Sequence, residues 1–278
     1  MKRIAVLITV HNRKQQTLEC LSHLESQTFT SIPTPQIEVY LTNDGCTDGT
    51  PQAIYENFPN VDVIDGNGDL FWNRGMYVAW KRAAQNEYDY YLWLNDDTNL
   101  YVDAIERLLI CSSKKDDKSV IVGSCSSKSD KGKITYGGRT KEGILIRDVS
   151  CEHQCVLFNG NIVLIPSFVF SQIGFNDQFY RHALGDFDYG HMVYRKGLVS
   201  YIAKGVYGEC DQHSTIPKWK DPNVGLIQRL KFLHTPGGNG SNPIEFFYYR
   251  NKNYGLIPAC LTFVSNYLHV LFPKLWGK

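Results

Sequence analysis

Apolar and polar positions alternate in blocks over the first hundred residues of the chain. Short continuous apolar runs, typical of strands buried on both faces, alternate with segments whose apolar residues recur at helical spacing. We expect strands at 4–8, 37–41, 61–64 and 90–94, and helices at 14–27, 50–57 and 73–86. This alternation of strand and helix predicts a parallel sheet with right-handed crossover connections.

The pattern is less regular beyond residue 100. Strands are expected at 120–124, 161–165 and 199–203, and helices at 167–173 and 185–196. From about Pro217 onward there is no strand pattern. Residues 254–273 carry no formal charge, and their polar side chains fall on one stripe of a predicted helix. Such an amphipathic helix would suit a membrane surface, or packing against the domain or a second subunit.

A cluster of polar residues follows each of the first four predicted strands. The clusters are Thr9–Arg13, Asn43–Asp48, Asp65–Asp69 and Asn95–Asp97. The carboxyl ends of parallel strands meet at one edge of the sheet, and open α/β sheets bind ligands along that edge. The sequence therefore predicts one binding site built from several of these clusters.

The adjacent acids Asp96 and Asp97 suggest a cation at this edge. Two neighbouring carboxylates repel each other unless a cation or hydrogen bonds offset the charge. Mg²⁺ and similar hard cations bind one or two carboxylates together with phosphate oxygens and waters. The same residues could instead cap a following helix.

Other candidate residues each have a structural alternative. Asp44 could accept hydrogen bonds from a base or ribose, or simply form a turn. The glycine-rich segment 66–75 could bring its backbone and Arg74 close to a phosphate, or be a loop packed by its own aromatic residues. Asp186 and Asp188 could supply a general base, or favour the start of a helix.

Histidine and cysteine positions give weaker signals. His213 could complete a Mn²⁺ coordination sphere, although a single histidine is more often a surface or core residue. The segment 151–155, Cys-Glu-His-Gln-Cys, has the spacing of a metal clip. Because no second pair follows at zinc-ribbon spacing, we do not expect a zinc site there.

The composition excludes several classes of protein. The 278 residues are 43% hydrophobic and 21% charged, which is unlike a disordered, collagen-like or coiled-coil chain. The 29 basic and 28 acidic residues give a formal net charge of +1, which provides no basic field for nucleic acid. The first residues lack the features of a signal peptide, so we expect a cytosolic protein whose cysteines stay thiols.

Together the motifs resemble those of family 2 glycosyltransferases with the GT-A fold. The resemblance covers about residues 4–255, and two stretches, 68–76 and 247–251, are similar to a rhamnosyltransferase-like branch. Its other elements are Val10-His11-Asn12-Arg13, Asn43-Asp44-Gly45, Asn95-Asp96-Asp97 as the DxD-type motif, and the region around Asp186. The resemblance implies an α/β GT-A fold, with a mostly parallel central sheet flanked by helices.

The resemblance also implies a domain organisation. Residues 1–215 would form the catalytic domain, with a nucleotide-binding half at about 1–100 and an acceptor half at about 101–215. Residues 216–278 would form a mainly helical extension.

Site roles follow from the resemblance, position by position. The residues implied to line the nucleotide pocket or approach the donor are Thr9, Asn12, Arg13, Asp44, Gly68, Asp69, Arg74 and Asp96. Asp97 and His213 are implied to ligate Mn²⁺ or Mg²⁺. Asp186 is implied as the catalytic base, with Asp188 as a rival because Gly185 stands where the family has Glu. Asn95 departs from the family in the same way, since it replaces the first acid of the DxD motif.

The implied activity is metal-dependent hexosyl transfer with inversion. A UDP- or dTDP-sugar would donate to a hydroxyl of a glycan or lipid-linked glycan in bacterial surface polysaccharide synthesis, with peripheral membrane contact through the C-terminal helix. Asn95 and Gly185 support one alternative, a non-catalytic nucleotide-sugar-binding relative that partners an active transferase. A nucleotidyltransferase would want a glycine-rich loop after the first strand, which is absent here. The sugar, the linkage and the oligomeric state stay open.

Overall fold

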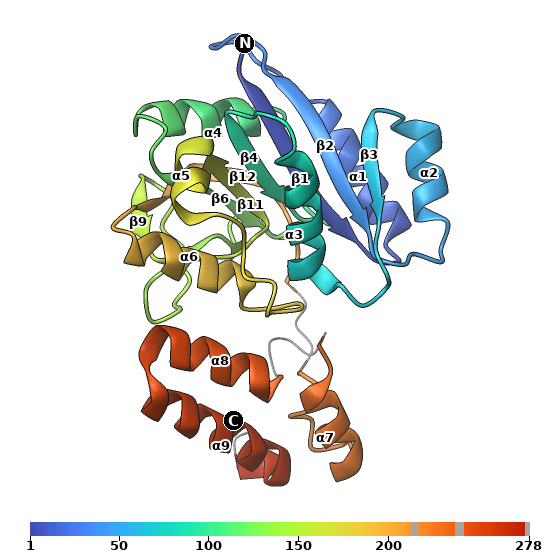
Figure 1. Cartoon of the computed structure of the whole chain (residues 1–278), viewed down its shortest axis with the longest axis vertical. Helices are drawn as coiled ribbons and strands as arrows, with labels where there is room; N and C mark the ends of the chain where they lie inside the picture. The colour runs from blue at the N-terminus through green and yellow to red at the C-terminus, as the bar shows by residue number, and fades with distance from the viewer. Residues whose placement is uncertain (213–215, 237–241, 276–278) are drawn as a thin grey trace.

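One large sheet organises the fold of the protein. The computed structural model describes residues 1–212, 216–236 and 242–275. The strand order is β3-β2-β1-β4-β11-β6-β12-β5, with β7 beside β6 and β9 beside β12 (Figure 1). The elements of the first half are β1 (Arg3–Val10), α1 (Lys14–Glu25), β2 (Gln36–Asn43), α2 (Thr50–Asn57), β3 (Val61–Asp65), α3 (Phe71–Ala83) and β4 (Tyr90–Leu94). They confirm the strands and helices expected there.

The second half of the sheet is more mixed than the first. The elements of this part of the chain are β5 (Asn99–Leu100), α4 (Ala104–Ser113), β6 (Val120–Ser126), β7 (Ile134–Tyr136), β8 (Gly138–Arg139), β9 (His153–Cys155), β10 (Leu157–Phe158), β11 (Ile162–Pro166), α5 (Ser167–Ile173), α6 (Gly185–Arg195) and β12 (Ser200–Glu209). Strands β8 and β10 pair with each other in a separate two-stranded sheet. Strand β11 runs antiparallel to both β4 and β6, whereas β12 is parallel to β6. The sheet as a whole is mostly parallel and flanked by helices, as expected.

The core fills both faces of this sheet. On one face Ile4, Val6 and Ile8 of β1 pack in a cluster that includes residues of α1, α2 and α4. On the other face Ala5 and Leu7 pack in a cluster that includes residues of α3, α5 and α6. The alternate side chains of β1 thus enter two separate apolar layers, which explains its unbroken apolar sequence.

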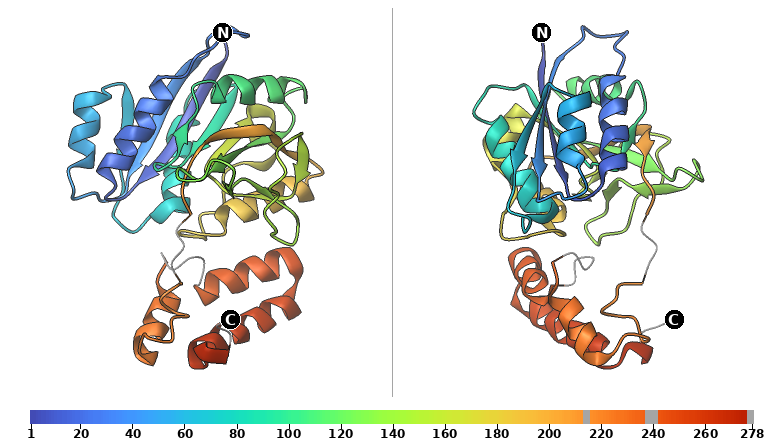
Figure 2. Two further views of the ribbon diagram at one scale, coloured as in Figure 1. Left: turned by 180° about the vertical axis from the view of Figure 1, so that it is seen from behind. Right: turned by 90° about the vertical axis from the view of Figure 1, so that its right-hand side faces the viewer.

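Among the described residues after the sheet domain are the α-helices α7 (Leu226–His234), α8 (Pro243–Tyr254) and α9 (Leu256–Leu271), followed by a short 3-10 helix, η1 (Pro273–Leu275). They lie beyond the sheet edge where β1 and β2 end, on the side away from the N-terminus (Figures 1 and 2). In the described part of the chain, no helix is long and apolar enough to cross a membrane.

Helix α8 is joined to the sheet domain by partly buried ion pairs. Arg181 pairs with Glu245 at 2.9 Å, and Lys252 Nζ lies 2.7 Å from Asp177 and 2.6 Å from Asp188. The side chain of Asp188 is fully buried. Because a buried charge is costly without a partner, Lys252 holds α8 against the start of α6.

Replacing Lys252 by methionine should therefore destabilise the protein. The substitution leaves the Asp188 carboxylate buried without its cation, and the free energy of unfolding should fall by about 3–5 kcal/mol. The double variant Asp188→Asn/Lys252→Met should recover most of this loss, because the fully buried carboxylate is then gone and the acid that still lacks its cation, Asp177, has a side chain that is 21% exposed. Denaturant unfolding of the two variants checks this, and a double variant as unstable as the single one would contradict it.

Candidate active site

A cavity of about 1040 Å³ opens at the carboxyl ends of the parallel strands. The end of β1, the segments after β2 and β4, and the first turn of α6 all contribute to its walls. The residues lining it are Thr9, His11, Arg13, Asp44, Gly68, Phe71, Trp72, Asn95, Asp96, Asp97, Tyr136, Asn159, Gly160, Asn161, His182, Ala183, Leu184, Asp186, Phe187, Cys210, Gln212 and Phe246. The polar clusters that follow separate strands in the sequence therefore meet in one cavity.

Arg13 bridges the two adjacent acids in this cavity. Its Nη1 donates to Asp97 Oδ2 at 2.7 Å and to Asp96 Oδ1 at 3.1 Å. One guanidinium thus offsets the repulsion between two carboxylates that strand β4 delivers side by side. Arg13 precedes α1 and comes directly from the end of β1, the neighbour of β4 in the sheet.

The two acids differ in burial. Burial raises the pKa of Asp96 to about 7, against the lowering effect of Arg13. Asp96 Oδ2 is buried and has no hydrogen-bond partner among the described residues. The Cys210 thiol lies 3.4 Å from Asp97 Oδ1, the carboxylate oxygen that Arg13 leaves free. An orphaned carboxylate oxygen beside a second carboxylate is a donor set that fits a hard divalent cation.

Asp186 stands in the first turn of α6. Its Oδ1 accepts from the Phe187 N–H at 2.8 Å, and its Oδ2 accepts from the Gly160 N–H at 3.1 Å. Burial raises its pKa to about 6. The carboxylate is therefore held in a fixed orientation and has the proton affinity of a useful general base near neutral pH.

Asn95 has a defined structural partner. Its Oδ1 accepts a hydrogen bond of 2.7 Å from the Trp72 indole, and Trp72 lies edge-on to the buried ring of Trp93. A Cβ at Gly160 would lie 2.3 Å from the Trp72 ring, so this ring needs a glycine beside it. The amide that replaces the first acid of the DxD motif thus fixes an aromatic wall of the cavity.

Packing also explains why a glycine stands at position 185. A Cβ added there would lie 1.8 Å from Asn73 Oδ1. Asn73 is fully buried, and its amide donates to the carbonyls of Asp177 and Tyr180 at 2.8 Å each. The close approach of α3 to α6 therefore excludes a glutamate at this position.

Asp44 organises the loop that precedes α3. Its Oδ1 accepts from the Gly68 N–H at 2.9 Å, and its Oδ2 accepts from the N–H groups of Leu70 and Phe71 at 3.1 and 2.8 Å. The backbone of Gly68 has a φ of +83°, which favours glycine. A single buried carboxylate thus shapes the glycine-rich segment where it meets the cavity.

The structure brings together some of the predicted site residues and leaves others outside. The predicted residues that line the cavity are Thr9, Arg13, Asp44, Gly68, Asp96, Asp97 and Asp186. Those that the described structure does not include in its lining are Asn12, Asp69, Arg74 and Asp188. His213 lies outside the described residues. The roles assigned to all of them stay predictions.

The residues outside the lining have other partners in the fold. Arg74 donates to the carbonyl of Gln178 at 2.8 Å, and Asn12 accepts from the Thr47 N–H at 2.7 Å. Asp188 accepts from Asn253 and Lys252 of α8. Asp69 is exposed on the loop.

Several lining residues had not been singled out from the sequence. His182 lies beside Phe71 in the cavity, and burial lowers its pKa, so the neutral imidazole is favoured. Its position four residues before Asp186 is the feature of the sequence that could have marked it as a site residue. Phe246, from α8, brings the C-terminal helices into the cavity wall, and no local pattern marks it.

The comparison with protein families agrees with this architecture. A model described as glycosyl transferase family 2 matches residues 5–171, more than half of the chain. The chain belongs to glycosyl transferase family 2. It is therefore a glycosyltransferase, as the motifs had suggested. The comparison with curated proteins returns no sequence match.

Solved structures similar to this family 2 glycosyltransferase are distant in sequence. One is a mannosyltransferase, PcManGT from Pyrobaculum calidifontis in complex with GDP-Man and Mn²⁺, at 14% identity and a TM-score of 0.56 over 99% of this chain and 88% of that one. Another is S. aureus TarS 1-349 in complex with UDP, at 13% identity and a TM-score of 0.51 over 91% of this chain and 72% of that one. These likenesses establish the shared GT-A fold.

Proposed function

We propose that this family 2 glycosyltransferase moves a hexose from a UDP- or dTDP-sugar to a hydroxyl of a glycan or lipid-linked glycan, with inversion, in the synthesis of bacterial surface polysaccharide. The observation that carries the proposal is one cavity lined by the Arg13–Asp96–Asp97 group and by Asp186. The first group suits a diphosphate with its cation, and Asp186 suits proton removal. The nucleotide ligands of the two similar structures, GDP-Man in one and UDP in the other, are consistent with a nucleoside-diphosphate donor.

Asp97, with Asp96 beside it, would hold Mn²⁺ or Mg²⁺, and His213 remains the predicted third ligand. When bound, the cation stabilises the charge of the departing diphosphate as a Lewis acid. Arg13, which contacts both carboxylates, would supply a positive charge beside the diphosphate. Thr9 and the loop held by Asp44 would then orient the nucleotide.

Asp186 is the base in this proposal. Its two backbone hydrogen bonds fix the carboxylate, which takes the proton of the acceptor hydroxyl as the oxygen attacks the anomeric carbon. A single displacement inverts the anomeric centre and needs no covalent enzyme intermediate. Asp188 is less suited to this role, because Lys252 and Asn253 already occupy its oxygens. The contacts of Asn95 with Trp72 and of Gly185 with Asn73 give both substitutions a packing role, which supports the catalytic interpretation over a non-catalytic relative.

Nucleotide binding should depend on the cation and on Asp97. With UDP or dTDP at about 100 times its dissociation constant, Mn²⁺ should add roughly 2.7 kcal/mol to the stability of the wild type. Asp97→Ala should abolish this gain, whereas Asp130→Ala, at an exposed loop, should keep it. Thermal unfolding with UDP, dTDP and GDP, each with and without Mn²⁺, provides the measurement. A flat response to all three nucleotides would sink the proposal.

Asp186→Asn should lower kcat by about 10²–10⁴-fold while leaving nucleotide binding intact. In the wild type, kcat/KM should fall as the pH drops below about 6, because the carboxylate must be ionised to accept a proton. Steady-state kinetics against pH checks both points. Asp188→Asn is the matched control variant, and its kcat/KM should still fall at acidic pH. If Asp188→Asn abolished this fall and Asp186→Asn did not, Asp188 would be the base.

We also propose that α9 touches a membrane carrying the acceptor. Its residues Ile257, Leu261, Val264 and Leu268 are 75, 67, 55 and 39% exposed and recur at helical spacing. Lys274, just beyond α9, adds a positive charge at the end of this apolar face. Such a face with nearby cationic groups fits an anionic lipid surface.

The triple variant Ile257→Gln/Leu261→Gln/Val264→Gln should lose binding to phosphatidylglycerol vesicles by at least about tenfold, since the full burial of even one such side chain contributes roughly 1.5–3 kcal/mol. The control variant Tyr55→Gln/Val102→Gln/Ile144→Gln, at similarly exposed positions elsewhere, should bind like the wild type. Vesicle sedimentation gives the affinities. Equal binding by all three proteins would refute membrane contact through α9.

A further inference from the structure

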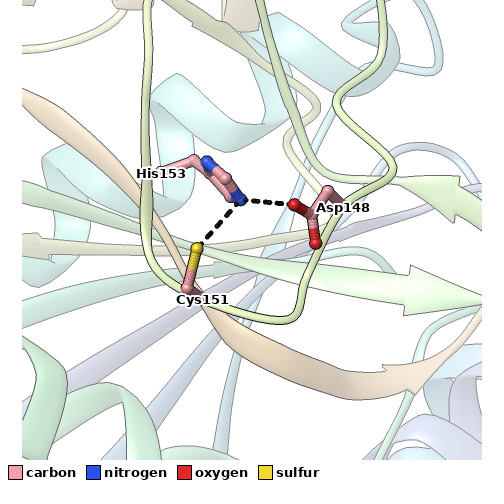
Figure 3. A group of neighbouring side chains, drawn as sticks. All are labelled: Asp148, Cys151 and His153. Atoms are coloured by element: carbon pink, nitrogen blue, oxygen red, sulfur yellow. Dashed lines mark hydrogen bonds and ion pairs between the residues drawn. The ribbon is translucent and has the colours of Figure 1, made fainter.

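Three side chains with metal-binding atoms converge on a loop away from the cavity. Asp148, Cys151 and His153 lie between β8 and the start of β9 (Figure 3). The Nε2 of His153 is 3.3 Å from Asp148 Oδ2 and 3.4 Å from Cys151 Sγ, and all three atoms lie within 4.8 Å of one another. None of these residues lines the catalytic cavity.

We propose that this cluster is a Zn²⁺ site, separate from the catalytic cation. Thiolate, imidazole and carboxylate are the three types of protein ligand that zinc takes. For a tetrahedral ion with usual bond lengths, nitrogen and oxygen ligands would be roughly 3.4 Å apart, and nitrogen and sulfur ligands roughly 3.6 Å apart. The two distances measured from His153 are close to these values. The third pair, Cys151 Sγ and Asp148 Oδ2, lies within 4.8 Å and would close to roughly 3.6 Å around a tetrahedral zinc ion.

The loop holds these ligands in position before any ion binds. The Ser150 hydroxyl and N–H donate to Asp148 Oδ1 at 2.6 and 2.9 Å, which leaves Oδ2 to face His153. The Val149 carbonyl accepts from the Gly205 N–H of β12 at 2.8 Å, and His153 pairs with Ile202 of the same strand. Both flanks of the loop are therefore tied to one strand, and the carboxylate has the hydrogen-bond support that metal ligands commonly have.

Neither Glu152 nor Cys155 supplies a fourth ligand to the proposed zinc ion. Glu152 turns away to pair with Lys115 at 2.7 Å. Cys155, which the sequence pattern groups with Cys151 and His153, is 7% exposed, and its sulfur lies beside Gly138 instead. Asp148 takes the place that the pattern gave to Cys155. Three protein ligands and one open position are characteristic of zinc sites that also accept water or another ligand.

The ligand types also separate this site from the catalytic one. A thiolate and an imidazole favour zinc, whereas the carboxylates of Asp96 and Asp97 suit Mg²⁺ or Mn²⁺. Millimolar Mg²⁺ should therefore not displace zinc from the loop.

Titration with Co²⁺ or Zn²⁺ alone, without nucleotide, tests the proposal on the whole protein. In the wild type, one equivalent of Co²⁺ should give a thiolate-to-metal absorption band that excess Mg²⁺ leaves unchanged and Zn²⁺ removes. Cys151→Ser should abolish the band, and His153→Gln should weaken metal affinity by at least about tenfold. Ser150→Ala, which removes only the support of Asp148, should weaken it by about tenfold.

Two control variants locate the ion. Cys260→Ser removes another exposed thiol, and Cys210→Ser removes the thiol beside Asp97, so both should keep the band. Circular dichroism verifies that each variant is folded. The proposal is overturned if the wild type gives no band, if the band survives in Cys151→Ser, or if it disappears in Cys210→Ser.

Discussion

Burial of β1 and β4 on both faces is the constraint on which the site depends. These neighbouring parallel strands are almost entirely apolar, and their alternate side chains enter two different core layers. A one-residue slip would send each side chain to the opposite core layer and would disrupt the packing of both layers. The point at which each strand turns polar is therefore fixed, and with it the relative positions of Arg13, Asp96 and Asp97.

That constraint makes a cluster of like charges tolerable. Asp96 is buried, and burial raises its pKa, yet Arg13, in the segment between β1 and α1, contacts both carboxylates. The guanidinium satisfies one oxygen of each acid and leaves Asp96 Oδ2 without a partner among the described residues. Arg13 thus offsets enough of the buried negative charge for the two acids to be tolerated in the folded protein. Asp96 Oδ2 is left as an oxygen that could bind a cation.

Local patterns sufficed to predict the first half of the fold and the polar edge of its sheet, because strand and helix periodicity are local properties. They could not predict that Arg74 would hydrogen-bond to the carbonyl of Gln178, or that Lys252 would pair with Asp188, since these contacts join residues far apart in sequence. The same holds for Phe246, which reaches the cavity only because α8 packs against the sheet domain. Asn95 and Gly185 looked like losses of catalytic acids, and their reasons became visible only through Trp72 and Asn73.

The loop at 148–153 shows how a spacing rule can select the wrong partner. Cys151, His153 and Cys155 have the regular spacing of a metal clip, but Cys155 is two residues along β9, roughly 6.6 Å from His153, and it packs against Gly138. The turn at Ser150 instead brings Asp148 to the imidazole. The path of the backbone decides which side chains come close enough to share an ion. A prediction of metal ligands from sequence should therefore consider residues on either side of a turn as well as residues at regular spacing.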